Sequence, residues 1–202
     1  MPKKFQRFYS TKKIRTISFD TNVLSDVPYY YSLEGKCRLA KKKKSYLERT
    51  SSSVLSIIVT LSLNIRPVGI ELVRKELARK PLFADLYDRV FERKQINVNR
   101  EIKWLAESYM KRINIDGPDA LILAATSVGK IDLFLSWNRD DVVNEKNLVK
   151  IREINKKRNV HFPIFATPKE FLERIFLTDK KTIWLSQLPV PSQYRPRFFQ
   201  TR

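Results

Sequence analysis

The sequence contains few of the residues on which common catalytic and cofactor sites are built. Cys37 is the only cysteine and His161 the only histidine among 202 residues. An internal disulfide is therefore excluded, and cysteine-rich zinc sites, multi-histidine metal sites and Ser-His-Asp catalysis are not expected. The four glycines form neither a GxGxxG nor a GxxxxGK motif, which argues against a glycine-rich phosphate-binding loop. Any catalysis must therefore depend on carboxylates.

Long apolar runs and acidic residues are also scarce. No run of about 18 apolar residues is present, and the first residues lack a signal-peptide pattern, so we expect a cytoplasmic protein that does not enter a membrane. The 21 acidic residues face 40 lysines and arginines, which leaves a formal net charge of +19. Because such a charge repels itself unless a polyanion offsets it, nucleic acid is the first partner to consider.

The order of apolar segments predicts an α/β fold. Four β-rich runs alternate with helical segments, which is typical of a central parallel sheet flanked by helices. The runs cover residues 14–19, 65–68, 131–136 and 161–166. The chain is long enough for one domain with additions, and we place that domain at residues 14–177.

Three basic segments lie outside this apolar pattern. Residues 1–13 form a basic N-terminal arm, residues 28–50 a basic insertion or lid, and residues 178–202 a basic, aromatic C-terminal tail. Cations interleaved with aromatic rings are how single-stranded nucleic acid is held without strict sequence reading. The same segments could instead solubilise the chain or dock on an acidic protein. The residues we expect to bind nucleic acid are Lys41, Lys42, Lys43, Lys44, Arg139, Arg195 and Arg197.

Carboxylates follow the predicted strands at places where they can converge. Asp20 follows the first strand, and the segment 137–141 follows the third; the carboxyl ends of parallel strands open on one rim of a sheet. Asp119 falls in the first turn of an apolar helix, where the helix dipole favours its ionised form. Glu76 lies on a helix after the second strand. If they converge, these carboxylates imply Mg²⁺ or Mn²⁺.

Four segments resemble the successive motifs of PIN domains, in the same order. They are ISFDTNVL, ELVRKEL, PDALILAAT and FLSWNRDD. The endings SWNRDDVVN and IFATPKEFL are most similar to the VapC-type toxins of toxin-antitoxin pairs. Over roughly residues 14–177, the resemblance implies a parallel sheet flanked by helices, Mg²⁺ or Mn²⁺ held by Asp20, Glu76 and Asp119, cleavage of single-stranded or structured RNA, and a homodimer.

The sequence departs from the family pattern at one acidic position. The fourth acidic position falls on Asn138, with Asp140 and Asp141 close behind, and we expect either Asn138 or the pair Asp140 and Asp141 to help position water. Asn22 either hydrogen-bonds the site or shapes the loop. Two alternatives stay open beside the nuclease: a catalytically weak PIN module that binds RNA or a ribosomal particle, and a toxin held by an acidic antitoxin-like protein.

Overall fold

The computed structural model describes residues 14–25, 65–91, 95–113 and 115–177, with side chains as far as residue 172. The predicted arm, insertion and tail lie outside the described residues. Within the described ranges, strands alternate with helices as the sequence predicts.

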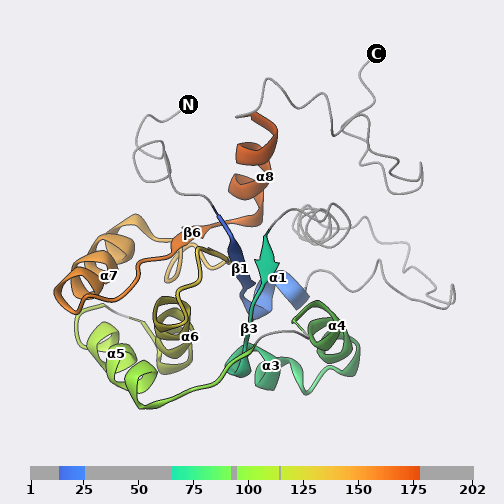
Figure 1. The fold of residues 1–202 in the computed structure, drawn as a ribbon, viewed down its shortest axis with the longest axis horizontal. Coiled ribbons are helices and arrows are strands. Elements are labelled where there is room, and N and C mark those ends of the chain that lie inside the picture. Colours follow the sequence, from blue (N-terminus) through green and yellow to red (C-terminus); the bar gives the residue numbers. More distant parts are fainter. Residues whose placement is uncertain (1–13, 26–64, 92–94, 114, 178–202) are drawn as a thin grey trace, which may run out of the picture.

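A four-stranded parallel sheet lies at the centre of the described chain (Figure 1). Its order is β2, β1, β5, β6, so the first of the described strands lies inside the sheet. Phe19 of β1 is paired with Leu135 of β5, which pairs in turn with Ala166 of β6. The expectation of a parallel α/β sheet is therefore confirmed. The strands are β1 (Thr16–Phe19), β2 (Arg66–Pro67), β5 (Leu133–Leu135) and β6 (Ile164–Ala166), with a separate parallel pair of β3 (Gly69–Ile70) and β4 (Gln95–Ile96).

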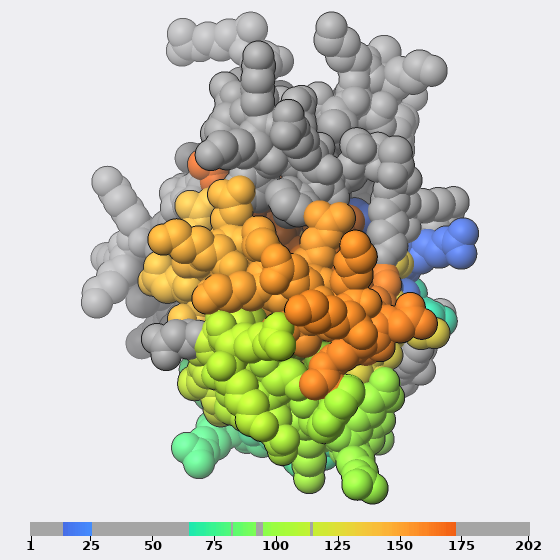
Figure 2. Space-filling model, turned by 90° about the vertical axis from the view of Figure 1, so that its left-hand side faces the viewer, coloured from blue at the N-terminus to red at the C-terminus, as the bar shows by residue number. Residues whose placement is uncertain are grey.

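The helices cover the sheet from two sides. Figure 1 shows α5, α6 and α7 grouped on one side of β1, and α3 and α4 on the other. Helices α5 and α7 lie next to each other on the surface (Figure 2). Among the described residues, no helix has the length and apolar character needed to cross a membrane. The helices are α1 (Thr21–Ser25), α3 (Glu71–Leu77), α4 (Pro81–Phe91), α5 (Arg100–Met110), α6 (Gly117–Val128), α7 (Glu145–Lys157) and α8 (Pro168–Leu177).

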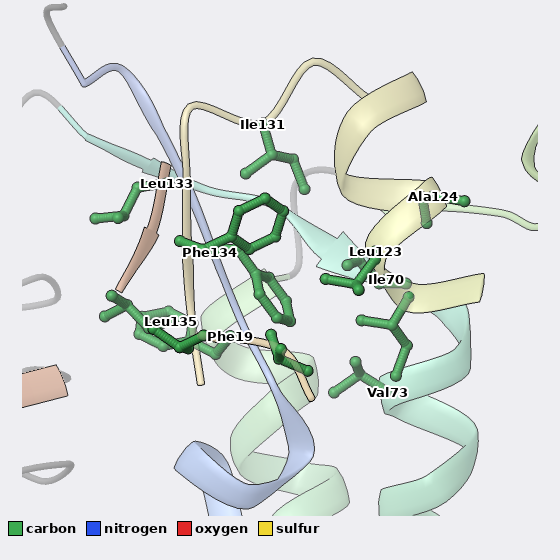
Figure 3. Close-up of a cluster of buried hydrophobic side chains, with 14 of the residues drawn as sticks. Phe19, Ile70, Val73, Leu123, Ala124, Ile131, Leu133, Phe134 and Leu135 are labelled. Carbon is green, nitrogen blue, oxygen red and sulfur yellow. The ribbon is translucent and has the colours of Figure 1, made fainter. Parts of the chain in front are cut away.

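Helix α6 and the central strands form the apolar core. Every residue of β5 is buried, as are Ile17 and Phe19 of β1, because strands covered by helices on both faces have no exposed side. Leu123 of α6 packs in the same cluster as Phe19 and Phe134 (Figure 3). Helix α6 begins directly after Asp116, whose carboxylate accepts a hydrogen bond from the backbone nitrogen of Asp119. Burial of α6 therefore fixes where Asp119 lies.

A carboxylate at the amino ends of the central strands sets their register. One oxygen of Asp132 accepts hydrogen bonds from the backbone nitrogens of Arg15 and Thr16, at 3.0 and 3.1 Å. The Thr16 hydroxyl also donates to this oxygen, at 3.1 Å, and accepts from the Asp132 backbone at 2.9 Å. These bonds join the start of β1 to the start of β5, so the carboxyl ends of the two strands also lie level.

We predict that Asp132→Ala lowers the free energy of unfolding by about 1 to 3 kcal/mol, because the backbone and hydroxyl donors of Arg15 and Thr16 lose their acceptor. Urea unfolding of the two proteins measures the change. Asp85→Ala is the matched control, because the ion pair of Asp85 with Arg89 is more than half exposed and such pairs contribute about 0.5 kcal/mol or less. A loss no larger than that of the control would contradict this role for Asp132.

Candidate active site

Asp20 is the most buried carboxylate at the carboxyl rim of the sheet. It follows β1 directly, and only 6% of the residue is exposed. One oxygen accepts from the backbone of Thr21 at 2.7 Å; the other accepts from the Asn22 amide at 2.8 Å and the Ser136 hydroxyl at 2.5 Å. Burial raises the pKa of Asp20, the charge of Glu76 adds to this rise, and the hydrogen bonds oppose it. The side chain is thus held in one orientation by three donors.

Ser136 and Asn22 join the ends of β1 and β5. The Asn22 amide oxygen accepts from the backbone of Trp137 at 3.0 Å, and its nitrogen lies 3.3 Å from the Ser136 hydroxyl. That hydroxyl accepts from the backbone of Asn138 at 2.9 Å. Asn22 therefore hydrogen-bonds the site. Our sequence reasoning missed Ser136, although a hydroxyl directly after a buried strand, opposite Asp20 in the register, was an available signal.

Asn138 brings two further carboxylates to the same rim. Its side-chain nitrogen donates to Asp119 at 3.0 Å and to Asp141 at 3.3 Å. Its side-chain oxygen accepts from the backbone of Asp141 at 3.1 Å, which closes the loop after β5. Asp140 is exposed. Of the two aspartates that we expected behind Asn138, the structure brings Asp141 into the cluster and leaves Asp140 at the surface.

Glu76 reaches the cluster from helix α3. It is exposed, and one of its carboxylate oxygens accepts a hydrogen bond from the hydroxyl of Thr21, the residue after Asp20. Glu71 lies on the same helix but points elsewhere, where its carboxylate accepts from the backbone of Val98 at 3.0 Å. The structure therefore places Glu76, and not Glu71, beside Asp20, as the sequence pattern predicts.

The electrostatics of Asp119 show that the carboxylates share one region. The pKa of Asp119 is raised to about 6, first by burial and then by negative charges nearby. Those charges belong to Asp20, Asp116, Asp141 and Glu76. Like charges that lie close together make ionisation costly, so the rim stores repulsion that a cation would relieve. We did not predict from the sequence that Asp116 contributes to this repulsion.

The donor set fits a hard divalent cation in its chemistry. Carboxylate and amide oxygens are the ligands that Mg²⁺ and Mn²⁺ prefer, and Asp20, Glu76, Asp119 and Asp141 supply them. In the part of the chain that the structure describes, however, no group of three or more His, Cys, Asp or Glu side chains is arranged to hold a metal ion. Protein donors occupy the carboxylates instead, as the amide of Asn138 does between Asp119 and Asp141.

Among the residues that we expect to bind nucleic acid, Arg139 lies in the part of the chain that the structure describes. Arg139 lies in the loop after β5, with 65% of its side chain exposed, and its guanidinium is 3.0 Å from the carboxylate of Glu170. Glu170 also forms a capping box with Thr167 at the start of α8. Arg139 therefore ties the site loop to α8 while it faces solvent. Lys41, Lys42, Lys43, Lys44, Arg195 and Arg197 lie outside the described residues.

We predict that Asp119→Asn stabilises the protein at about pH 7.5 by about 1 kcal/mol, a value reduced for the solvent screening of a half-buried group. The folded-state pKa of about 6 is above the ordinary value, so the native protein loses stability as the pH rises from about 4 to about 6. Asparagine cannot ionise, and the gain should disappear near pH 4.

Thermal unfolding without added metal, at both pH values, measures this difference. Asp85→Asn is the control because Asp85 is exposed on α4, and it should show no comparable dependence on pH. Equal stability of Asp119→Asn and the unmodified chain at the higher pH would show that the carboxylates do not repel one another as described.

Two comparisons of the sequence with known proteins found no match. No family model matches the chain, and no curated protein sequence is significantly similar to it. The interpretation of the site therefore depends on the arrangement of its residues and on the motifs in the sequence.

Proposed function

We propose that this chain is a divalent-metal-dependent endoribonuclease with a PIN-like fold. The observation that carries the proposal is the meeting of four separate segments at one rim of the sheet. Asp20 follows β1, Glu76 lies on α3, Asp119 lies on α6 and Asp141 lies in the loop after β5. Like charges that lie close together destabilise a fold, and groups whose pKa values are perturbed in this way cluster at active sites.

The residues would divide the chemistry among themselves. Asp20, Glu76, Asp119 and Asp141 would hold the ion, with the oxygen of Asn138 as a neutral neighbour. A bound divalent ion lowers the pKa of water and offsets charge on the phosphate. Asp20 is fixed by Ser136 and Asn22 and would keep its place through a reaction.

RNA as the substrate is supported by charge and by motif resemblance. The net charge of +19 suits a polyanion, and phosphate contacts make such binding fall steeply with salt concentration. Carboxylates alone do not distinguish RNA from DNA. The choice of RNA follows from the four segments that resemble PIN motifs, with Asp20, Glu76 and Asp119 in the matching places.

A second candidate is a catalytically weak module that binds RNA. The amide of Asn138 favours it, because this neutral group donates to both Asp119 and Asp141. Because a protein donor already bridges these two carboxylates, a cation would stabilise them less. The two candidates agree on RNA binding and differ on cleavage, so one experiment separates them.

We predict cleavage of a mixed panel of labelled single-stranded RNAs in Mg²⁺ or Mn²⁺ and none in EDTA. Asp20→Asn and Asp119→Asn should each reduce the rate by about 100-fold or more, because each removes a charge that would hold the ion, and loss of one electrostatic contact to a transition state has a cost of this order. Asp140→Asn should keep most of the activity, because Asp140 is not among the charges that act on Asp119. Gel analysis of the products gives the rates and the cut sites.

Filter binding in EDTA, run beside the cleavage assay, shows whether each variant still holds RNA. Cleavage lost with binding retained supports the nuclease. RNA binding without cleavage in any metal would contradict it and favour the second candidate. Equal cleavage by the unmodified chain and Asp119→Asn would point to a contaminating nuclease and would also contradict the proposal.

A further inference from the structure

A half-exposed tryptophan lies on the surface formed by α5 and α7, away from the carboxylate rim. Trp104 of α5 is 53% exposed, and the guanidinium of Arg158, directly after α7, lies over its ring, 3.2 Å from the ring centroid. Figure 2 shows the two helices side by side on this face. One face of the indole is therefore occupied by a cation, and the exposed area leaves ring surface open to solvent.

One nitrogen of the Arg158 guanidinium, Nη1, is buried and has no hydrogen-bond partner among the described residues. Stacking on an aromatic face is attractive for a guanidinium, and here that contact holds the group in place. The consequence is a tryptophan ring backed by a positive charge, which favours an electron-rich or anionic ligand on the open side.

A shallow depression lies beside the ring, lined by Arg100, Glu101 and Trp104. Its three side chains offer the contacts that an unpaired nucleotide uses. An aromatic ring stacks a base, a guanidinium pairs with a phosphate, and a carboxylate accepts from an amino group on a base edge. A purely electrostatic surface would not need the ring or the carboxylate.

The surroundings of the depression are strongly basic. Across residues 100–112 and 145–158, ten basic side chains face four acidic ones. All ten basic residues except the stacked Arg158 are exposed. They are Arg100, Lys103, Lys111, Arg112, Lys146, Lys150, Arg152, Lys156, Lys157 and Arg158.

The depression lies on a path toward the carboxylates. From Trp104, helix α5 runs to Met110, about 9 Å further along its axis. Met110 is next to Gly117, the first residue of α6, and Asp119 follows in the first turn of that helix. A strand that follows α5 from Trp104 would therefore arrive at the start of α6, where the carboxylates are.

We infer that Trp104, Arg100 and Glu101 form a second contact for single-stranded nucleic acid, in which the Trp104 ring stacks one unpaired base. Arg158 holds the ring from behind, and the basic residues of α5 and α7 contact the phosphates. This contact rests on the proposed RNA substrate and adds to it a binding position outside the carboxylate rim.

Fluorescence anisotropy in EDTA, with labelled oligouridine and oligoadenosine, tests the contact on the full chain. Trp104→Ala should weaken binding by about 5-fold or more, since stacking of one base contributes about 1 to 3 kcal/mol. The salt dependence should stay the same because no phosphate contact is lost. Trp104→Phe should restore much of the affinity, whereas Trp104→Leu should not. Arg100→Gln should reduce the salt slope by about one.

Two controls separate stacking from damage to the fold. Val149→Ala removes an exposed apolar side chain of α7 and should bind RNA as the unmodified chain does. Inorganic polyphosphate has no bases. The affinity for it, measured by its displacement of labelled RNA, should be the same for Trp104→Ala and for the unmodified chain.

Equal RNA affinity of Trp104→Ala and the unmodified chain would overturn the inference. That result is expected if this face binds an acidic protein instead of RNA. Equal affinity of Trp104→Phe and Trp104→Leu would overturn it as well, because an aromatic ring would then not be needed. These outcomes do not depend on cleavage, because the binding assay is run in EDTA. Asp119→Asn should bind RNA as the unmodified chain does in this assay, and the cleavage assay tests the proposed function separately.

Discussion

The pairing of β1 with β5 is the constraint on which the rest of the site depends. Phe19 lies opposite Leu135 in the register, so the next residues, Asp20 and Ser136, meet at the rim with a hydrogen bond of 2.5 Å between them. Asp132 fixes the same register at the other end of the strands. A slip by one residue would turn each side chain of β1 to the opposite face and would separate Asp20 from its donors.

Around this pair, the fold balances repulsion between carboxylates against donors of its own. Asn22 and Ser136 stabilise the buried charge of Asp20, while Asn138 donates to both Asp119 and Asp141. The pKa of Asp119 is raised first by burial and then by the neighbouring carboxylates, so repulsion between the carboxylates adds to the cost of burial. Functional sites commonly keep such a stability cost, and the rim carries it while the core beneath is apolar and closely packed.

Sequence patterns predicted the parts of the fold that depend on burial. The β-rich runs at residues 14–19 and 131–136 contain β1 and β5, and the apolar helix expected to carry Asp119 is α6. The two-residue strand β4 was not predicted, because so short a segment has no measurable period.

At the site, the residues that follow strands or open helices could be predicted, and those that depend on loop conformation could not. Asp20 and Asp119 belong to the first group. The choice between Asp140 and Asp141 belongs to the second, since it depends on how the loop turns after Asn138. The double donation by Asn138 is likewise set by the backbone of that loop, and no spacing in the sequence encodes it.

The central claim is that the carboxylates at the rim bind a divalent cation, and direct titration of the full chain with Mn²⁺, followed by electron paramagnetic resonance of the free ion, tests it. We expect saturable binding at about pH 7.5 that weakens at about pH 5, as Asp119 becomes protonated, and that is lost in Asp20→Asn and Asp119→Asn. Absence of Mn²⁺ binding by the unmodified chain, or binding that both substitutions leave unchanged, would contradict it.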